Sequence, residues 1–271
     1  MKIKADASAD AAYPRVATHL LQGFAAYSRH YVRRHFHSIR ILKNGLPPPD
    51  ISSPLVIYLN HASWWDPLVC LHLARKYFAD RRSFAPIDEA SLQRYGFFKQ
   101  LGFYGVEQKS ARGTMMFLRT TCRLLGSAGN MVWLTPQGRF MDVRQRPLRL
   151  QHGIGSLAAH LENVAFVPLA IEYTLWTEPR PEILLSFGHS AVPKIAPLRS
   201  SRDWTEFFSD ALEKAQDELA ARSSRRDSAD WIVLDSGKSG INAIYDTWRW
   251  LKSRIRGRGF ARRHSTEERI W

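Results

Sequence analysis

The stretch Pro54-Leu-Val-Ile-Tyr-Leu-Asn-His-Ala-Ser-Trp-Trp-Asp-Pro67 joins an apolar run to a short polar turn. Residues 54–59 have the length and the apolar side chains of a buried strand. Asp66 followed by Pro67 is typical of a helix start, because the carboxylate can cap the first turn and proline fits the first helical position. The stretch therefore predicts a strand, a turn and a helix.

The same alternation continues along the chain and predicts an α/β fold. Strands are expected at residues 54–59, 103–107, 131–135, 164–173 and 182–187. Helices are expected at residues 67–78, 88–100, 111–125, 154–162 and 203–222. Strands that alternate with helices favour a single mixed, largely parallel sheet flanked by helices. We place this domain at residues 51–222, after an N-terminal basic helical arm (1–50) and before a connector and a basic, aromatic C-terminal helix (223–271).

Composition limits the class of protein. With 271 residues, 45% of them hydrophobic and 24% charged, the chain is that of an ordinary globular protein. Its two cysteines, Cys70 and Cys122, are too few for a disulfide scaffold or a cysteine zinc site and suit a reducing compartment. The first ten residues do not read as a secretory signal, and no run reaches the roughly 18 apolar residues of a membrane-spanning helix. We expect no metal and no cofactor.

The net charge of +14 is concentrated at the two ends of the chain. Residues 1–50 carry +5 and residues 236–271 carry +6, which leaves only +3 for the 185 residues between them. Basic ends on a nearly neutral body indicate an acidic partner, either an anionic lipid surface or nucleic acid.

Residues 14–42 predict a basic amphipathic helix, or two. Its apolar stripe consists of Val16, Leu20, Phe24, Tyr27, Tyr31 and His35. Arg29, Arg33, Arg34 and Arg40 lie off that stripe. Such a helix could rest at a bilayer interface or pack on the core of its own protein, and the pattern leaves both open. Near the C-terminus, Trp248 and Trp250 stand among arginines, which also suits a membrane interface.

His61 and Asp66 are the candidate catalytic residues. They follow a predicted strand, and in α/β sheets reactive groups gather beyond the carboxyl ends of strands. A carboxylate five residues after the histidine can hold one ring nitrogen, which leaves the other free to take a proton from a hydroxyl. A structural interpretation stands beside this one: Asp66 could be only a helix cap and His61 only a polar residue at a strand end.

Four blocks resemble those of the glycerophospholipid acyltransferase family, which includes 1-acylglycerol-3-phosphate acyltransferases. The first is Asn60-His61 followed by Asp66-Pro67, and the third is Thr135-Pro-Gln-Gly-Arg139, where the family usually has Pro-Glu-Gly-Thr-Arg. The second, Leu101-Gly-Phe-Tyr-Gly-Val-Glu-Gln-Lys109, and the fourth, Val167-Pro-Leu-Ala170, are weaker alone. The four occur in the family's order over roughly residues 50–190.

The resemblance implies roles for these residues. It implies that His61 is the general base, that Asp66 orients it, and that acyl-CoA or acyl-carrier protein is the donor. It also implies contacts with substrate for Gln137, Gly138 and Arg139, and we add Asn60 and Lys109 from the first and second blocks. Arg144, Arg146 and Arg149 extend the basic stretch after the third block.

Two departures from the family pattern leave the acceptor open. Gln108 stands where the second block has an arginine, with Lys109 beside it, and Gln137 replaces the glutamate of the third block. Lysine neutralises a phosphate but lacks the two-pronged geometry of arginine. The acceptor is a lysophospholipid or another lipid hydroxyl, such as that of a glycolipid, an ornithine-type lipid or a glycosylated terpenoid.

Three functions are compared. An O-acyltransferase of phospholipid biosynthesis, peripheral on the cytoplasmic side of the membrane, accounts for the four blocks and the basic ends. A thioesterase-like hydrolase would use the same histidine to activate water. A non-enzymatic basic protein that binds membrane or nucleic acid would need only the charged ends, but no recognisable nucleic-acid motif is present, so nucleic acid is not expected as a partner.

Overall fold

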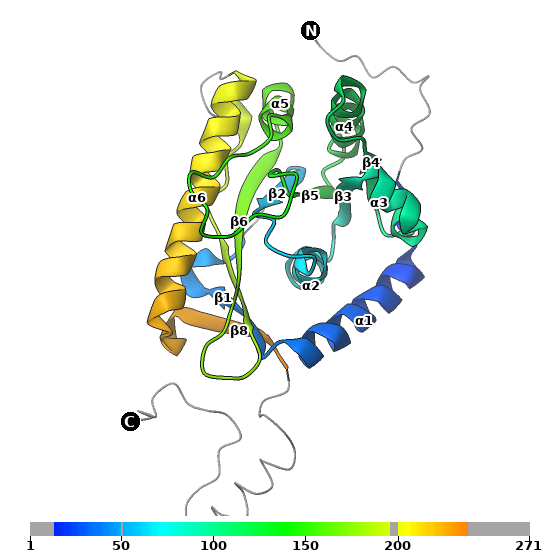
Figure 1. Ribbon diagram of the computed structural model, residues 1–271. Coiled ribbons are helices and arrows are strands. Elements are labelled where there is room, and N and C mark those ends of the chain that lie inside the picture. The colour runs from blue at the N-terminus through cyan, green and yellow to red at the C-terminus, as the bar shows by residue number, and fades with distance from the viewer. Residues whose placement is uncertain (1–13, 50, 196–199, 238–271) are drawn as a thin grey trace, which may run out of the picture.

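The computed structural model describes residues 14–49, 51–195 and 200–237. These residues form a single eight-stranded sheet in the order β4-β3-β5-β2-β6-β7-β1-β8, with helices on both faces (Figure 1). The strands are β1 (Ser38–Leu42), β2 (Leu55–Leu59), β3 (Arg82–Asp88), β4 (Phe103–Val106), β5 (Asn130–Leu134), β6 (Ala165–Thr174), β7 (Glu182–Phe187) and β8 (Trp231–Ser236). The helices are α1 (Thr18–His35), α2 (Asp66–Tyr77), α3 (Glu89–Arg94), α4 (Ala111–Leu124), α5 (Gly153–His160) and α6 (Ser201–Arg225). Four short 3-10 turns complete the list: η1 (Lys43–Gly45), η2 (Gly96–Gln100), η3 (Pro193–Ile195) and η4 (Ser228–Asp230).

The sheet is mixed and mostly parallel, as the sequence predicted. Strands β4, β3, β5, β2 and β6 pair in parallel, whereas β6 with β7 and β1 with β8 pair antiparallel. The four strands β2, β5, β7 and the first part of β6 are buried on both faces. This burial explains their unbroken apolar runs, which are typical of strands covered on both sides.

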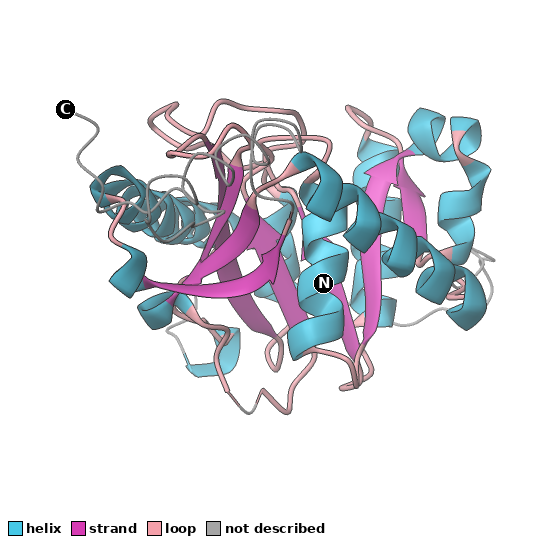
Figure 2. Ribbon diagram, turned by 90° about the horizontal axis from the view of Figure 1, so that it is seen from below, coloured by secondary structure: helices cyan, strands magenta, loops and turns pink. Residues whose placement is uncertain are grey.

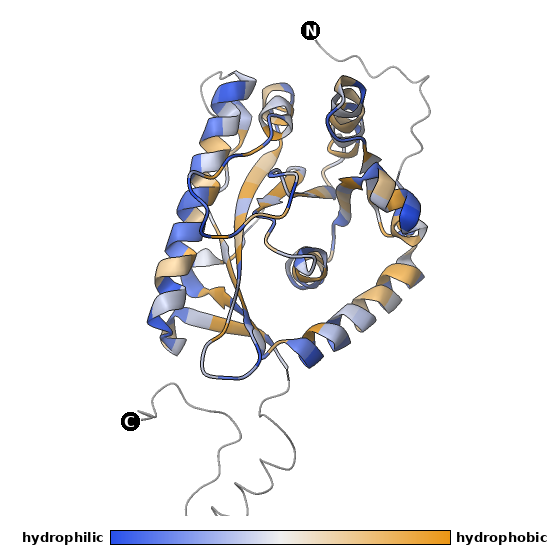
Figure 3. Ribbon diagram, in the orientation of Figure 1, coloured by the Kyte–Doolittle hydropathy of each residue, from blue (hydrophilic) through white to orange (hydrophobic). Residues whose placement is uncertain are grey.

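Two layers of helices cover the sheet. Helices α1 and α2 pack on one face, with Val32 and Leu73 in the same core as alternate residues of β2 and β6. Helices α4, α5 and α6 pack on the other, where Leu124, Leu157 and Phe208 meet the opposite side chains of the same strands. Figure 2 shows the twisted sheet between these layers, and in Figure 3 its strands are mainly apolar while α6 carries many hydrophilic residues.

The sheet extends beyond residues 51–222. Residues 38–42 form β1 rather than the end of a helix, and residues 231–236 of the connector form β8. Inside the domain, residues 82–88 add β3, which the sequence pattern did not predict. In β1 the branched side chains Ile39 and Ile41 are buried between neighbouring strands, so pairing overrides the helical spacing. The expected helix at 88–100 is split into α3 and η2. The basic, aromatic C-terminal helix expected around Trp248 and Trp250 lies outside the described residues.

Helix α1 contacts the protein through buried residues beside the predicted stripe and through part of the stripe itself. Its buried residues are Ala25, Ser28 and Val32, on the side that meets α2. Leu20 and Tyr27 of the stripe are exposed. Phe24 and Tyr31 of the stripe are partly buried and pack against the same core, so only part of the stripe is left at the surface.

Ion pairs also attach α1 to the last strand. Arg29 Nε and an Arg33 guanidinium nitrogen lie 3.3 and 2.8 Å from the carboxylate of Asp235 in β8. Part of the basic charge of the helix is therefore used within the protein. None of the helices in the described ranges has the length and hydropathy needed to cross a membrane.

Candidate active site

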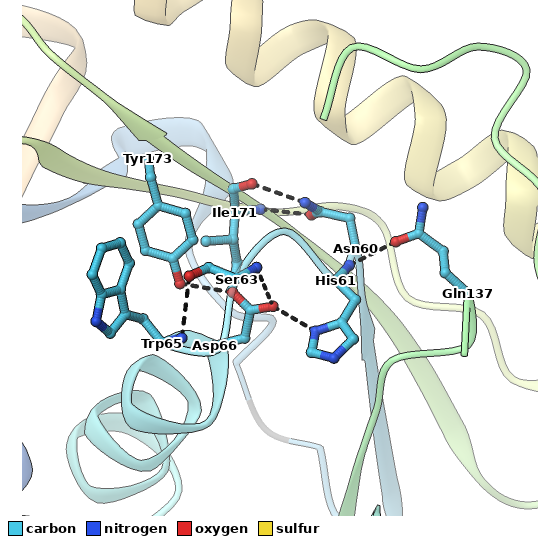
Figure 4. Close-up of polar contacts among 8 residues, drawn as sticks. All are labelled: Asn60, His61, Ser63, Trp65, Asp66, Gln137, Ile171 and Tyr173. Carbon is cyan, nitrogen blue, oxygen red and sulfur yellow. Dashed lines mark hydrogen bonds and ion pairs between the residues drawn. The ribbon is translucent and has the colours of Figure 1, made fainter. Parts of the chain in front are cut away.

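His61 and Asp66 meet in the turn between β2 and α2. His61 Nδ1 lies 2.7 Å from Asp66 Oδ2, and Asp66 is only 1% exposed (Figure 4). Asp66 is the first residue of α2, and the cap position, Trp65, makes no side-chain cap. The carboxylate is therefore directed at the histidine, and the interpretation of Asp66 as a mere helix cap is not the one the structure supports. Within the described residues the other ring nitrogen, Nε2, has no protein partner.

The Asp66 carboxylate is fixed by three donors. Besides His61, the backbone N–H of Ser63 donates to Oδ2 at 3.1 Å, and the hydroxyl of Tyr173 donates to Oδ1 at 2.7 Å. Burial and the charge of Asp66 raise the pKa of Tyr173 well above its ordinary value, so its hydroxyl remains a donor. A carboxylate with charge-assisted bonds to both oxygens has little freedom to rotate.

Asn60 fastens the start of the turn to β6. Its Nδ2 donates to the carbonyl of Ile171, and its Oδ1 accepts the N–H of the same residue, both at 2.9 Å. The side chain is 1% exposed and uses both of its polar atoms in this pair. The structure thus gives Asn60 a supporting role instead of the substrate contact expected from the sequence.

The loop after β5 holds the main chain of His61 from both sides. Gln137 Oε1 accepts the His61 N–H at 2.6 Å, and the Met141 N–H donates to the His61 carbonyl at 2.9 Å. Gln137 is 5% exposed. Gly138 turns the loop at φ 69°, a left-handed conformation that favours glycine. The third block therefore lies against the His61–Asp66 pair, and Gln137 holds the main chain of His61.

The two cationic candidates are at the surface. Arg139 is exposed, and its Nε contacts Met141 Sδ at 3.1 Å rather than a carboxylate. Lys109 is exposed after β4, next to the Ser110 that caps α4, and no contact joins it to His61 or Asp66 in the described residues. Of the other basic residues in this loop, Arg144 pairs with Asp142 and Arg146 with Asp217.

Aromatic residues surround the turn between β2 and α2, and the sequence did not indicate which of them lie beside His61 and Asp66. The Phe140 ring lies 4.2 Å from the His61 ring and is 58% exposed. Trp64 and Trp65 have different surroundings. Trp65 packs on Phe36 and Tyr173 at the core, while Trp64 is 56% exposed. Phe140 and Tyr173 were both missed, because their contacts with the pair join distant parts of the chain.

The comparison with protein families identifies the class of this site. Residues 31–172 match the family model described as Acyltransferase, which is more than half of the chain. The chain belongs to the Acyltransferase family. The matched segment of this acyltransferase contains the His61–Asp66 pair and the third block, and it ends one residue before Tyr173.

Individual proteins show less similarity to this chain than the family model does. No curated protein matches this acyltransferase. Among solved structures it is similar to the 1-acyl-sn-glycerophosphate (LPA) acyltransferase PlsC from Thermotoga maritima, with 14% sequence identity and a TM-score of 0.49. That match covers 75% of this chain and 80% of the other.

Metal ligands do not gather near the pair. Across the described parts of this acyltransferase, no three His, Cys, Asp or Glu side chains are placed to hold a metal ion.

Proposed function

We propose that this protein is an O-acyltransferase that moves a fatty acyl group from a thioester to a lipid hydroxyl, with His61 as the general base. The observation that carries the proposal is the 2.7 Å contact between His61 Nδ1 and the buried Asp66 carboxylate, with Nε2 left without a protein partner. This is the arrangement that general-base catalysis requires, since one nitrogen is held and the other is open to a hydroxyl.

The reaction needs no covalent enzyme intermediate. The acceptor hydroxyl gives its proton to His61 Nε2 as its oxygen attacks the thioester carbonyl. The resulting imidazolium is stabilised by Asp66, and the C–S bond breaks as the carbonyl re-forms. The proton then passes from Nε2 to the departing thiolate, which returns the histidine to its neutral form. General-base help of this kind is worth about 10²–10⁴ in rate.

Arg139 and Lys109 are proposed to meet the phosphates of the substrates. Both are exposed, and neither is paired with a carboxylate in the described residues, whereas Arg144 and Arg146 already are. Phosphates are carried by acyl-CoA, by the phosphopantetheine arm of acyl-carrier protein and by phospholipid acceptors. Arg139 can bind such a group through two parallel hydrogen bonds, while Lys109 supplies a point charge.

We further propose peripheral binding to an anionic membrane, on the cytoplasmic side. A band of exposed aromatic and apolar side chains starts at η2 and runs over α1 to the catalytic turn. Phe97 contacts Phe24, and Tyr31 contacts Trp64, each with ring centroids 5.7 Å apart. The exposed members of this aromatic band are Leu20, Tyr27, Trp64 and Phe97.

This surface has the composition of a membrane interface. Aromatic rings are favoured at the level of the lipid head groups, and basic residues beside them each add about 1 kcal/mol near an anionic leaflet. A lipid acceptor that stays in the membrane would then reach His61 past Trp64. The position of the band beside the catalytic turn supports an acceptor drawn from the bilayer.

An acceptor screen tests the proposal. Purified wild type and His61→Ala are given acyl-CoA with lysophospholipids, glycolipids or hydroxylated lipids in vesicles, and thiol release is followed together with lipid product. We expect release that depends on one acceptor class and is absent in the variant. Equal release with water alone would assign the protein as a thioesterase.

A further inference from the structure

Strand β6 supplies one side chain that contacts the catalytic pair directly. The hydroxyl of Tyr173 donates to Asp66 Oδ1 at 2.7 Å, while His61 and the Ser63 N–H bind the other oxygen, Oδ2 (Figure 4). Two residues earlier on the same strand, Ile171 holds Asn60. We infer that Tyr173 is a positioning residue for the proposed reaction: its hydroxyl fixes the Asp66 carboxylate, and the carboxylate in turn orients His61.

The ring and the hydroxyl of Tyr173 have separable roles. The ring packs against Trp65 and Phe36, with centroids 5.6 and 5.8 Å apart, so phenylalanine would preserve this contact. Without the hydroxyl, Asp66 Oδ1 would face these aromatic rings with no donor. A buried carboxylate oxygen that lacks a hydrogen bond is strongly disfavoured, so the carboxylate would draw harder on its remaining donors, the His61 ring and the Ser63 N–H, both at Oδ2.

The direction of the effect on His61 follows from the charges at this contact. The titratable groups around it are His61 and Asp66 of the turn, Cys70 of α2 and Tyr173 of β6. Burial raises the pKa of the Cys70 thiol, which therefore stays neutral. The cationic side chain in the loop that contacts His61 is that of Arg139. Removing the donor from Asp66 leaves its negative charge less compensated, which favours the imidazolium and raises the pKa of His61.

The test is an NMR titration of His61 in wild type and Tyr173→Phe. The pKa of His61 is expected to rise by roughly half a unit to one unit in the variant, and the acid limb of the kcat profile to move by the same amount. At neutral pH we expect kcat to fall about tenfold with KM for the thioester nearly unchanged. The matched control is Tyr104→Phe, which removes a buried hydroxyl bonded to Thr121 on the other face of the sheet and should leave the pKa of His61 unchanged.

Two further variants extend the test, and the first keeps the inference falsifiable if Tyr173→Phe folds poorly. Replacing Tyr173 with 3-fluorotyrosine keeps the ring and strengthens the donor, so the pKa of His61 should shift downward. In an Asp66→Asn background, Tyr173→Phe should have no additional effect on kcat, because the two residues act through one contact. An unchanged pKa in both Tyr173 variants, or additive losses in the double variant, would overturn the positioning role.

The titration does not depend on the reaction being acyl transfer. A shift of the His61 pKa without any acyltransferase activity would support the contact and refute the proposed function. Acyltransferase activity that depends on His61 but not on the Tyr173 hydroxyl would support the proposed function and refute the positioning role of Tyr173.

Discussion

Gln137 Oε1 accepts the backbone N–H of His61 at 2.6 Å, so the residue that replaces the family's glutamate is bonded to the main chain of the proposed base. An amide oxygen and a carboxylate oxygen can both accept this hydrogen bond. The substitution therefore preserves the contact while removing a negative charge beside the histidine. This relationship predicts how the position responds to mutation.

Gln137→Glu is expected to retain most of the activity, whereas Gln137→Leu is not. Leucine leaves the His61 N–H without its acceptor, which should destabilise the protein by about 1–3 kcal/mol and lower kcat. Urea unfolding and steady-state rates measure the two effects. Gln145→Leu, at an exposed position of the same loop, is the control and should change neither. Equal loss in the glutamate and leucine variants would show that the acceptor oxygen is not what the site requires.

Asn60→Ala is expected to lower the free energy of unfolding. It removes both hydrogen bonds to Ile171 and leaves a buried N–H and a buried carbonyl without partners, at a cost of roughly 2–5 kcal/mol in the free energy of unfolding. Chemical denaturation gives this value directly. The exposed Asn44→Ala should unfold like wild type. A decrease in the free energy of unfolding below about half a kcal/mol would argue against a stabilising role for the hydrogen bonds between Asn60 and Ile171.

Replacing Tyr27 and Trp64 by serine is expected to weaken membrane binding. Both side chains are exposed on the aromatic band, so their loss removes apolar area from the proposed interface. Co-sedimentation with vesicles of anionic phospholipid should show at least a tenfold decrease in partitioning, about 1.4 kcal/mol. Met115→Ser, an exposed apolar residue of α4 on the other side of the sheet, is the control. If the variant that lacks Tyr27 and Trp64 binds vesicles as well as wild type does, the aromatic band is not the membrane-facing surface.

The attachment of α1 should weaken in acid. Burial alone would raise the pKa of Asp235, but the guanidinium groups of Arg33 and Arg29 outweigh it and hold the pKa below its ordinary value. Because the folded-state pKa is depressed, the stabilisation is complete above the unfolded value of about 3.9 and is lost as the pH falls through the lower folded value.

Asp235→Asn measures this contribution. The free energy of unfolding of wild type should exceed that of the variant by roughly 1 kcal/mol or less near pH 6, since both arginines are about half exposed. This difference should shrink toward pH 3. Unfolding by urea at the two pH values supplies the comparison. A difference that grows in acid would reverse the sign and refute the account. Asp80→Asn, at an exposed residue after α2, should show no such trend.

The sequence predicted the centre of the fold better than its edges. Strands β2, β5 and β7 and the first part of β6 are apolar runs buried on both faces, and such runs can be recognised without a structure. Strands β1 and β8 are as long as β2 and β7, but β1 contains Arg40 and β8 is only partly buried, so their sequences carry less of this apolar signal. They pair with each other, and β1 also pairs with β7. The sequence predicted the apolar stripe of α1, but the fully buried residues Ala25, Ser28 and Val32 lie beside it, and the stripe itself is only partly buried against the core.

The candidate site shows the same limit. His61 and Asp66 are five residues apart, so their spacing was informative by itself. Tyr173 lies 107 residues from Asp66 and Gln137 lies 76 residues from His61, and only the order of the parallel strands brings them together. A tyrosine at the end of an apolar strand carries no signal that distinguishes a hydrogen-bond donor from a core residue. The local pair could be predicted; its supports could not.

The most direct test of the central claim is the rate of acyl transfer from thioester to lipid acceptor by wild type and His61→Ala, with folding checked by thermal unfolding. If His61 is the general base, the variant should be folded and its kcat should fall by about 10²–10⁴, with thioester binding retained. A folded variant that transfers acyl groups at the wild-type rate would contradict the assignment of His61.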